Sequence, residues 1–116
     1  MKRRGEISPS LWFFQNASLM AKSLEENKFK TRNAKTAPAR ARALKVCEDC
    51  ERTLDKAWDL IGVIAEESGD EIAEIVAAHF LFCEDWYEVS TRTGYSRDRC
   101  KRWAYKAIKR LDDDGR

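Results

Sequence analysis

The chain of 116 residues contains only one histidine, two prolines and five glycines. A single histidine argues against histidine-supported catalysis, and the sequence has no glycine-rich phosphate loop and no nucleophile elbow. So few helix-breaking residues favour long helices. No segment alternates apolar and polar residues in the manner of a strand. The sequence therefore predicts an all-α fold, and its length fits one small domain with an arm better than a multidomain enzyme.

Long apolar runs are also missing. The longest, residues 11–14 and 75–83, fall well short of the roughly 20 residues that a membrane span needs. Polar residues at positions 15, 16 and 18 interrupt the apolar start, so we expect no secretory signal peptide. The sequence therefore predicts a cytoplasmic protein without a membrane partner, whose four cysteines are reduced thiols.

The net charge of +2 conceals three blocks of opposite sign. Residues 1–45 carry 11 basic and 3 acidic residues, a net of +8. Residues 46–91 carry 2 basic and 13 acidic residues, a net of −11, and residues 92–111 carry 8 basic residues and one acid, a net of +7. A basic block can hold a polyphosphate or another anionic partner, and the ordinary alternative is a solvated helix face. The acidic block either is such a face, or keeps DNA to one side of the molecule, or offers a surface to a basic partner.

Two helices are expected before residue 68. Ser8 and Pro9 form a helix start signal, and apolar residues then recur at helical spacing, which predicts a helix from about 9 to 26. The polar, basic stretch 27–38 predicts a linker. A second, long helix over about 39–67 has a narrow apolar seam, which suits packing against another helix. That seam comprises Leu44, Cys47, Leu54, Trp58, Ile61 and Ala65. The chain thus divides into an N-terminal helix with a basic linker arm (1–38) and a helical domain (39–116).

Three further helices are expected after residue 68. Gly69 suits a left-handed C-terminal cap, and Asp70 suits the N-cap of a helix over about 71–83. The buried side of that helix is expected to include Ile72, Ile75, Val76, His79 and Phe82. A short helix over about 85–92 and a last helix over about 97–111 follow. The four tryptophans, Trp12, Trp58, Trp86 and Trp103, are expected to anchor the core.

Residues 85–111 have the pattern of a helix-turn-helix, in which the second helix enters the major groove of DNA. Gly94 accepts the positive φ of the turn, and Ser90 is small enough for the two helices to cross closely. Ser96 is expected to cap the second helix. The buried stripe of that helix is expected to comprise Cys100, Trp103, Ala107 and Leu111. Long cationic side chains occupy most of its other positions, and such side chains hold phosphates or pair with guanine.

The run SRDRCKRW at 96–103, followed by KAIKRL at 106–111, resembles the recognition helix of bacterial sigma-factor region four. Upstream, WYEV at 86–89 and TGYS at 93–96 resemble the small phage late-gene regulators of the RinA and ArpU type. The resemblance is close over 85–111, looser over 71–111, and does not extend to residues 1–40. It implies a sequence-specific DNA-binding transcriptional regulator of phage origin. Its partner would be double-stranded DNA, with RNA polymerase as a further candidate, and no cofactor or metal is implied.

By this resemblance the DNA-binding residues are Ser96, Arg97, Asp98, Arg99, Lys101, Arg102 and Lys106. Arg97, Asp98, Lys101 and Arg102 fall where the family reads base edges, and Arg99 falls nearer the DNA backbone. Asp98 stands where the family usually has Glu, and Arg102 stands where it has Gln. We therefore expect the DNA sequence that is read to differ from a standard promoter element. No segment resembles the promoter-melting part of a sigma factor, which favours a regulator over a complete sigma factor.

The cysteines raise the alternative of a metal site. Cys47 and Cys50 form a CxxC, and His79 and Cys83 would complete a set of four zinc ligands. In a hairpin that turns near residue 69, however, Cys83 lies about five residues from Cys50, or roughly 7.5 Å along the helix axis. Zinc ligands must converge on one ion, so buried thiols and a packed His79 are the favoured interpretation, without a metal.

Two rival functions stay open. The first is a protein-interaction or assembly module, such as a DNA-packaging subunit, in which the basic helix or the long apolar seam contacts another protein. A homodimer is compatible with the apolar surface of residues 9–26 and 39–67. The second rival is an enzyme, which the sequence disfavours because it contains no recognisable catalytic constellation.

Overall fold

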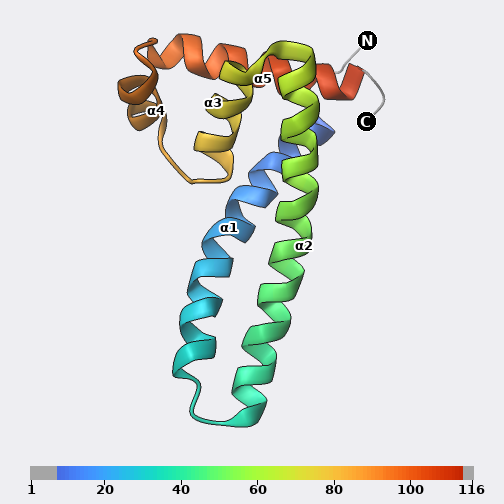
Figure 1. Cartoon of the computed structure of the whole chain (residues 1–116), viewed down its shortest axis with the longest axis vertical. Coiled ribbons are helices and arrows are strands. Elements are labelled where there is room, and N and C mark those ends of the chain that lie inside the picture. Colours follow the sequence, from blue (N-terminus) through green and yellow to red (C-terminus); the bar gives the residue numbers. More distant parts are fainter. Residues whose placement is uncertain (1–7, 114–116) are drawn as a thin grey trace.

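The computed structural model describes residues 8–113, which form five helices and no strand. The helices are α1 (Pro9–Asn33), α2 (Ala37–Ser68), α3 (Asp70–Phe80), α4 (Trp86–Thr93) and α5 (Arg97–Asp113). α1 and α2 form a long antiparallel hairpin, and the other three helices gather at one end of it as a head (Figure 1). The expected all-α fold is confirmed, and its long antiparallel pair is α1 with α2.

α1 begins as the sequence predicts, because the Ser8 hydroxyl accepts the backbone N–H of Leu11 at 3.1 Å and Pro9 is the first helical residue. The predicted linker over 27–38 is wrong. Residues 27–33 continue α1, and only residues 34–36 connect it to α2. Asn27 and Thr31 each donate a hydrogen bond of 2.8 Å to a carbonyl one turn earlier, so polar side chains that suggested a loop instead support the helix. Packing against α2 then covers one side of this polar end of α1.

The buried face of α2 differs from the predicted seam. Cys47 and Ile61 are buried as expected, but Leu44 and Trp58 are 46% and 44% exposed. The buried residues are Ala43, Cys47, Cys50, Ala57, Ile61 and Ile64. Most of these side chains are small, which lets α1 and α2 approach closely and leaves large side chains at the rim of the contact.

Large aromatic side chains are distributed differently from expectation. Trp86 and Trp103 are half-buried against the core, whereas Trp12 and Trp58 are 59% and 44% exposed. Phe82 was expected on the buried side of a helix reaching residue 83, but it is 63% exposed. α3 ends at Phe80, so the turn that follows carries Phe82 out of the helical register.

Gly69 joins α2 to α3 in a conformation that only glycine adopts readily. Its φ of 100° is positive, as predicted, but its ψ of 156° places it in an extended region rather than in the left-handed helical one. Asp70 is the first residue of α3 rather than its N-cap, and no side chain caps this helix end. The predicted break is therefore confirmed, whereas the predicted capping role of Asp70 is wrong.

One hydrophobic core joins the head to the adjoining half of the hairpin. Phe14 of α1 contacts Phe80 of α3, with ring centroids 5.8 Å apart, and both rings are buried. The C-terminal end of α5 is tied to the start of α1, because the Asp112 carboxylate accepts the backbone N–H of Ser10 at 2.9 Å and pairs with the Ser8 hydroxyl. Toward the far end of the hairpin the core shrinks to a small cluster of Leu24, Cys47 and Cys50.

Candidate nucleic-acid interface

α4 is defined by residues at both of its ends. Asp85 and Glu88 form a reciprocal capping box: the Asp85 side chain accepts the Glu88 N–H at 2.8 Å, and the Glu88 side chain accepts the Asp85 N–H at 3.1 Å. The helix ends at Gly94, whose φ of 82° and ψ of −1° are left-handed. The Gly94 N–H donates to the Ser90 carbonyl at 2.9 Å, so the predicted positive φ at Gly94 is confirmed.

Side chains hold the turn between α4 and α5. The Ser90 hydroxyl donates to the Tyr95 carbonyl at 2.6 Å, and the Tyr95 N–H donates to the Thr93 hydroxyl at 3.3 Å. Ser96 then caps α5, because its hydroxyl accepts the Arg99 N–H at 3.1 Å. The sequence predicted the Ser96 cap. It did not predict the hydrogen bond of Ser90, because the prediction for this residue concerned only its small size where the two helices cross.

The buried stripe of α5 sets which side chains point outward. Cys100, Ala107 and Leu111 are buried as predicted, while Trp103 is only half-buried. The other buried positions are Ala104 and Ile108. With about 100° per residue, the position directly opposite this stripe falls near Asp98, Arg102, Lys106 and Lys109. Arg99 and Arg110 lie on one flank of that outer surface and Lys101 lies on the other, whereas Arg97 in the first turn falls on the side of the buried stripe and is exposed there.

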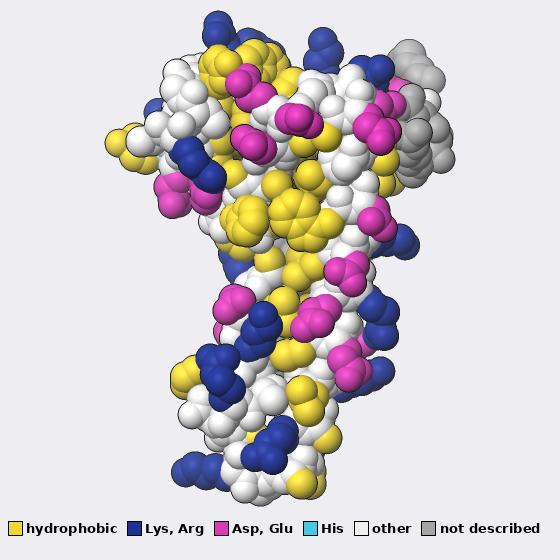
Figure 2. Space-filling model, in the orientation of Figure 1, with side chains coloured by type: hydrophobic (Ala, Val, Ile, Leu, Met, Phe, Trp, Pro, Cys, Tyr) yellow, Lys and Arg dark blue, Asp and Glu magenta, His cyan; other side chains and the backbone are white. Residues whose placement is uncertain are grey.

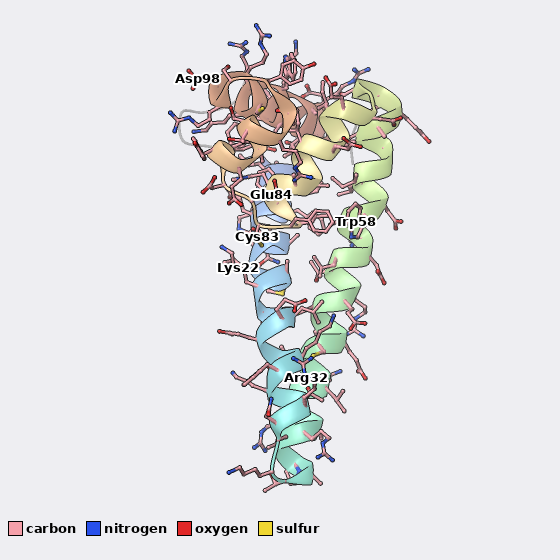
Figure 3. The ribbon with its side chains drawn as sticks, turned by 60° about the vertical axis from the view of Figure 1, so that its left-hand side comes forward. Lys22, Arg32, Trp58, Cys83, Glu84 and Asp98 are labelled. Atoms are coloured by element: carbon pink, nitrogen blue, oxygen red, sulfur yellow. The ribbon has the colours of Figure 1, made fainter. Side chains whose placement is uncertain are left out.

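All seven predicted site residues are exposed and lie on α5 or at its start. Nitrogen-tipped side chains project from this helix away from the hairpin, with Asp98 at the edge of the group (Figure 3). α5 brings them together at its exposed N-terminal end, but they do not share one face, because Arg97 and Arg99 point to opposite sides of the helix. Ser96 differs from the others in that its hydroxyl is already occupied as the helix cap.

Most cations of this surface have no acidic partner among the residues that the structure describes. Within residues 8–113, no carboxylate lies within ion-pair distance of Arg97, Lys101 or Arg102. Arg110, by contrast, donates to the Glu67 carbonyl at 3.1 Å and pairs with the Glu67 carboxylate at 3.9 Å. Among the residues that the structure describes, uncompensated positive charge therefore extends from the first turn of α5 to Lys106 and Lys109, while Arg110 and Asp112 engage α2 and α1.

Two of the cations lie over aromatic rings that the sequence did not predict to be part of the site. The Arg99 guanidinium lies 5.7 Å from the Trp103 ring centroid, and the Trp103 ring packs edge-on against Tyr95 at 4.8 Å. The Lys101 ammonium lies 6.0 Å from the Tyr105 ring centroid. The signal that could have indicated these pairs is the spacing of four residues between each cation and its ring.

Tyr95 also connects the turn to α3. Its hydroxyl donates to the Glu71 carboxylate at 2.7 Å, and this hydrogen bond to a negatively charged acceptor raises the pKa of Tyr95. This hydrogen bond holds the turn against the start of α3.

His79 is packed and hydrogen-bonded, as the sequence suggested. Its ring stacks on Trp86 with centroids 3.8 Å apart, and its Nδ1 lies 2.7 Å from the Glu84 carbonyl. Burial lowers the pKa of His79 despite that hydrogen bond. Cys50 contacts the Met20 sulfur at 3.8 Å, while Cys83 contacts the Ser18 carbonyl at 3.7 Å. In the described part of the chain, no three His, Cys, Asp or Glu side chains form a group that could hold a metal ion.

Between residues 8 and 113, no helix combines the length and the apolar character that crossing a membrane requires. The chain matches no protein-family profile, no curated protein and no solved structure. The resemblance to sigma-factor region four and to the phage regulators therefore rests on the short motifs within residues 86–111 alone.

Proposed function

We propose that this chain is a sequence-specific DNA-binding transcriptional regulator of the phage late-gene type. In this proposal α4 and α5 are a helix-turn-helix, and α5 enters the major groove by its N-terminal half. The observation that carries the proposal is the exposed basic surface of α5, where Arg97, Lys101 and Arg102 have no ion-pair partner within residues 8–113. This surface directly follows a turn held by Ser90, Gly94 and Ser96. No bond is made or broken, and no cofactor or metal takes part.

The placement of α5 supports entry by its N-terminal half. Its C-terminal end is held by the contacts of Asp112 with α1 and of Arg110 with Glu67. Its N-terminal end extends beyond the hairpin, next to α4 (Figure 1). Recognition helices present their N-terminal residues to base edges, while neighbouring elements contact the DNA backbone. Arg97, Asp98, Lys101 and Arg102 are the residues proposed to read bases, and Ser96, Arg99 and Lys106 to contact phosphates or flanking positions.

The experiment that tests this proposal is selection of bound sequences from a pool of random duplexes at two salt concentrations. We expect an enriched motif that persists at the higher salt. Retention without a motif, lost steeply with salt, would indicate backbone binding alone. No retention at either salt would contradict DNA binding and favour a protein-interaction function.

An assembly or protein-interaction module stays the second candidate, because an aromatic pair is exposed on the hairpin. The Trp58 and Phe82 rings pack edge-on at 5.7 Å beside a groove of about 780 Å³. Figure 2 shows hydrophobic side chains gathered along the seam of the hairpin below the head. Such a patch suits a protein contact, including a homodimer or RNA polymerase. Measuring the mass of the purified chain by sedimentation, with and without duplex DNA, separates self-assembly from DNA-dependent assembly.

A further inference from the structure

The tip of the α1–α2 hairpin is strongly basic, and it lies at the opposite end of the molecule from α5 (Figure 1). No acidic residue occurs between positions 27 and 47. Seven exposed cations surround the connection between the two helices: Lys28, Lys30, Arg32, Lys35, Arg40, Arg42 and Lys45. We call these seven residues the hairpin tip.

The charge of the hairpin tip is mostly uncompensated. Lys28 lies 3.9 Å from the Glu25 carboxylate, and Lys45 lies 3.9 Å from the Asp49 carboxylate. For the other five cations, no carboxylate in residues 8–113 lies within ion-pair distance. Like charges placed so closely repel one another, and an anionic partner would relieve that repulsion.

The tip also has a shape that can seat a phosphate chain. A shallow groove of about 460 Å³ runs between the ends of the two helices. Lys30 of α1 and Arg42 of α2 are its two cations, Asn27 and Asn33 add amides, and the rest of the lining is apolar and includes Phe29, which is 60% exposed. Cations from both helices therefore flank one hollow, so a backbone lying there could contact both sides at once.

A straight duplex lying across the outer surface of α5 does not reach the hairpin tip. The molecule is 50 Å long, and the cations of α5 project away from the hairpin (Figure 3). Acidic side chains follow α2 along the hairpin between the two ends (Figure 2), and the exposed ones in the middle of this helix are Glu48, Asp49, Glu51, Asp55 and Asp59. DNA carries one negative charge per roughly 1.7 Å of its axis, so this acidic stretch repels a duplex laid along the hairpin.

We propose that the hairpin tip is a second DNA-binding surface, which holds the phosphates of a duplex without reading its sequence. One molecule would then join two duplex segments, one at α5 and one at the tip. The joining of two duplexes rests on the proposed DNA-binding function of α5, whereas phosphate binding by the tip does not.

Two matched variants test the tip. The tip variant carries Lys30→Gln, Lys35→Gln and Arg42→Gln, and the control variant carries Lys22→Gln, Arg52→Gln and Lys56→Gln. Both remove three exposed cations, and glutamine keeps a good helix propensity. Circular dichroism first establishes that both variants keep the helix content of the wild-type chain.

The first measurement is capture of a free, labelled duplex by wild-type protein bound to a second duplex on beads. We expect capture by the wild-type chain and the control variant, and its loss in the tip variant. No capture by the wild-type chain, or equal capture by the tip variant, would overturn the proposal. Equal capture would indicate instead that a protein–protein contact joins the duplexes.

The second measurement separates the tip from α5. For non-specific duplex, the slope of log K against log salt should be shallower by about 2 to 3 in the tip variant than in the control variant. A shallower slope without any selected motif in the wild-type chain would overturn the α5 function and leave the tip surface standing. An unchanged slope together with a selected motif would overturn the tip surface and leave the α5 function standing. Tip-dependent binding to phosphatidylserine vesicles, with no effect on DNA, would overturn the proposal in favour of a membrane surface.

Discussion

Individual side chains perform two different tasks on α5. Ser96 and Asp112 occupy its two ends and satisfy backbone groups of this helix and of α1. Arg97 and Arg102 lie on its exposed surface, and no carboxylate in residues 8–113 forms an ion pair with either. The side chains at the helix ends stabilise the fold, whereas the exposed arginines are available for binding. Substitutions at the first positions should therefore change stability, and substitutions at the second should change binding.

Replacing the arginines tests the proposed base contacts. We expect Arg97→Ala or Arg102→Ala to weaken binding to the selected DNA motif by about 1–3 kcal/mol and to relax its sequence preference. Arg52→Ala, an exposed arginine of α2, serves as the control and should leave the preference unchanged. Fluorescence anisotropy with matched and scrambled duplexes measures both effects. A uniform loss on both duplexes would indicate that the arginines contact phosphates instead.

Removing the carboxylate at the end of α5 tests the connection between the two helices. Asp112→Ala should lower the free energy of unfolding by about 0.5–2 kcal/mol, because the backbone N–H of Ser10 loses its acceptor. Asp113→Ala, at the exposed neighbouring position, should change it by less than about 0.5 kcal/mol. Urea denaturation followed by circular dichroism measures the difference. Equal stability of the two variants would show that the contact contributes nothing.

Helix ends decide how the elements of the head are oriented. Gly94 allows α4 to stop and α5 to start within three residues, and the Ser90 and Thr93 side chains hold that turn. The loop between α3 and α4 depends on His79, which stacks on Trp86 and bonds to the Glu84 carbonyl. Both connections determine where the outer surface of α5 points.

The left-handed conformation of Gly94 predicts a cost for any other residue. Gly94→Ala should destabilise the fold by about 1–2 kcal/mol, since its φ of 82° is unfavourable for an L residue. A Cβ would meet no atom within 4 Å, so the cost is conformational and not steric. Gly62→Ala, also without a neighbour within 4 Å but inside α2, should instead stabilise by roughly 0.5–1 kcal/mol. Chemical denaturation of both variants checks the opposite signs.

The buried position of His79 predicts a pH dependence. Burial lowers the pKa of His79 in the folded chain, so the unfolded chain binds more protons as the pH falls through the ordinary range near 6.5. The contribution of His79 to stability is therefore fully present above that range and decreases below it. We expect the loss of stability between pH 7.5 and 5.5 to be smaller in His79→Gln than in the wild-type chain. Urea unfolding at both pH values measures this, and equal losses would contradict it.

The whole molecule is held by a core that is concentrated at one end. The main cluster joins α1 and α2 to the three helices of the head, whereas the far half of the hairpin has only the small cluster around Leu24, Cys47 and Cys50. Fewer buried apolar contacts mean a lower free energy of local opening. The hairpin tip therefore combines high positive charge with weak local stabilisation.

This uneven core predicts graded protection of the backbone amides. Hydrogen exchange should be slowest in α3, in α5 and in the residues of α1 and α2 that adjoin them, and should become faster along the hairpin toward residues 34–36. Mass spectrometry of exchanged peptides gives the profile, with the main core as the internal reference. Equal protection along the full length of α2 would show that the hairpin does not open locally.

Local signals were sufficient for much of this protein. The scarcity of glycine and proline, the helical spacing of apolar residues and the signals at Ser8, Gly94 and Ser96 determined that the chain is helical and where most helices begin and end. These features act over three or four residues, through capping hydrogen bonds and permitted backbone angles, so they can be read from neighbouring positions. The grouping of cations on α5 follows from the same periodicity.

Only the tertiary structure decided which faces are buried and what lies at each end of the molecule. Packing on α2 turned the expected linker over 27–38 into the last turns of α1 and a short connection, because burying one side of a polar helix compensates for its weak propensity. The close approach of small residues on α2 left Trp58 at the rim, which no count of apolar positions could reveal. The hairpin also placed the cations of residues 28–45 and those of α5 at opposite ends, with acidic side chains of α2 between them, because that arrangement depends on contacts between residues far apart in the chain.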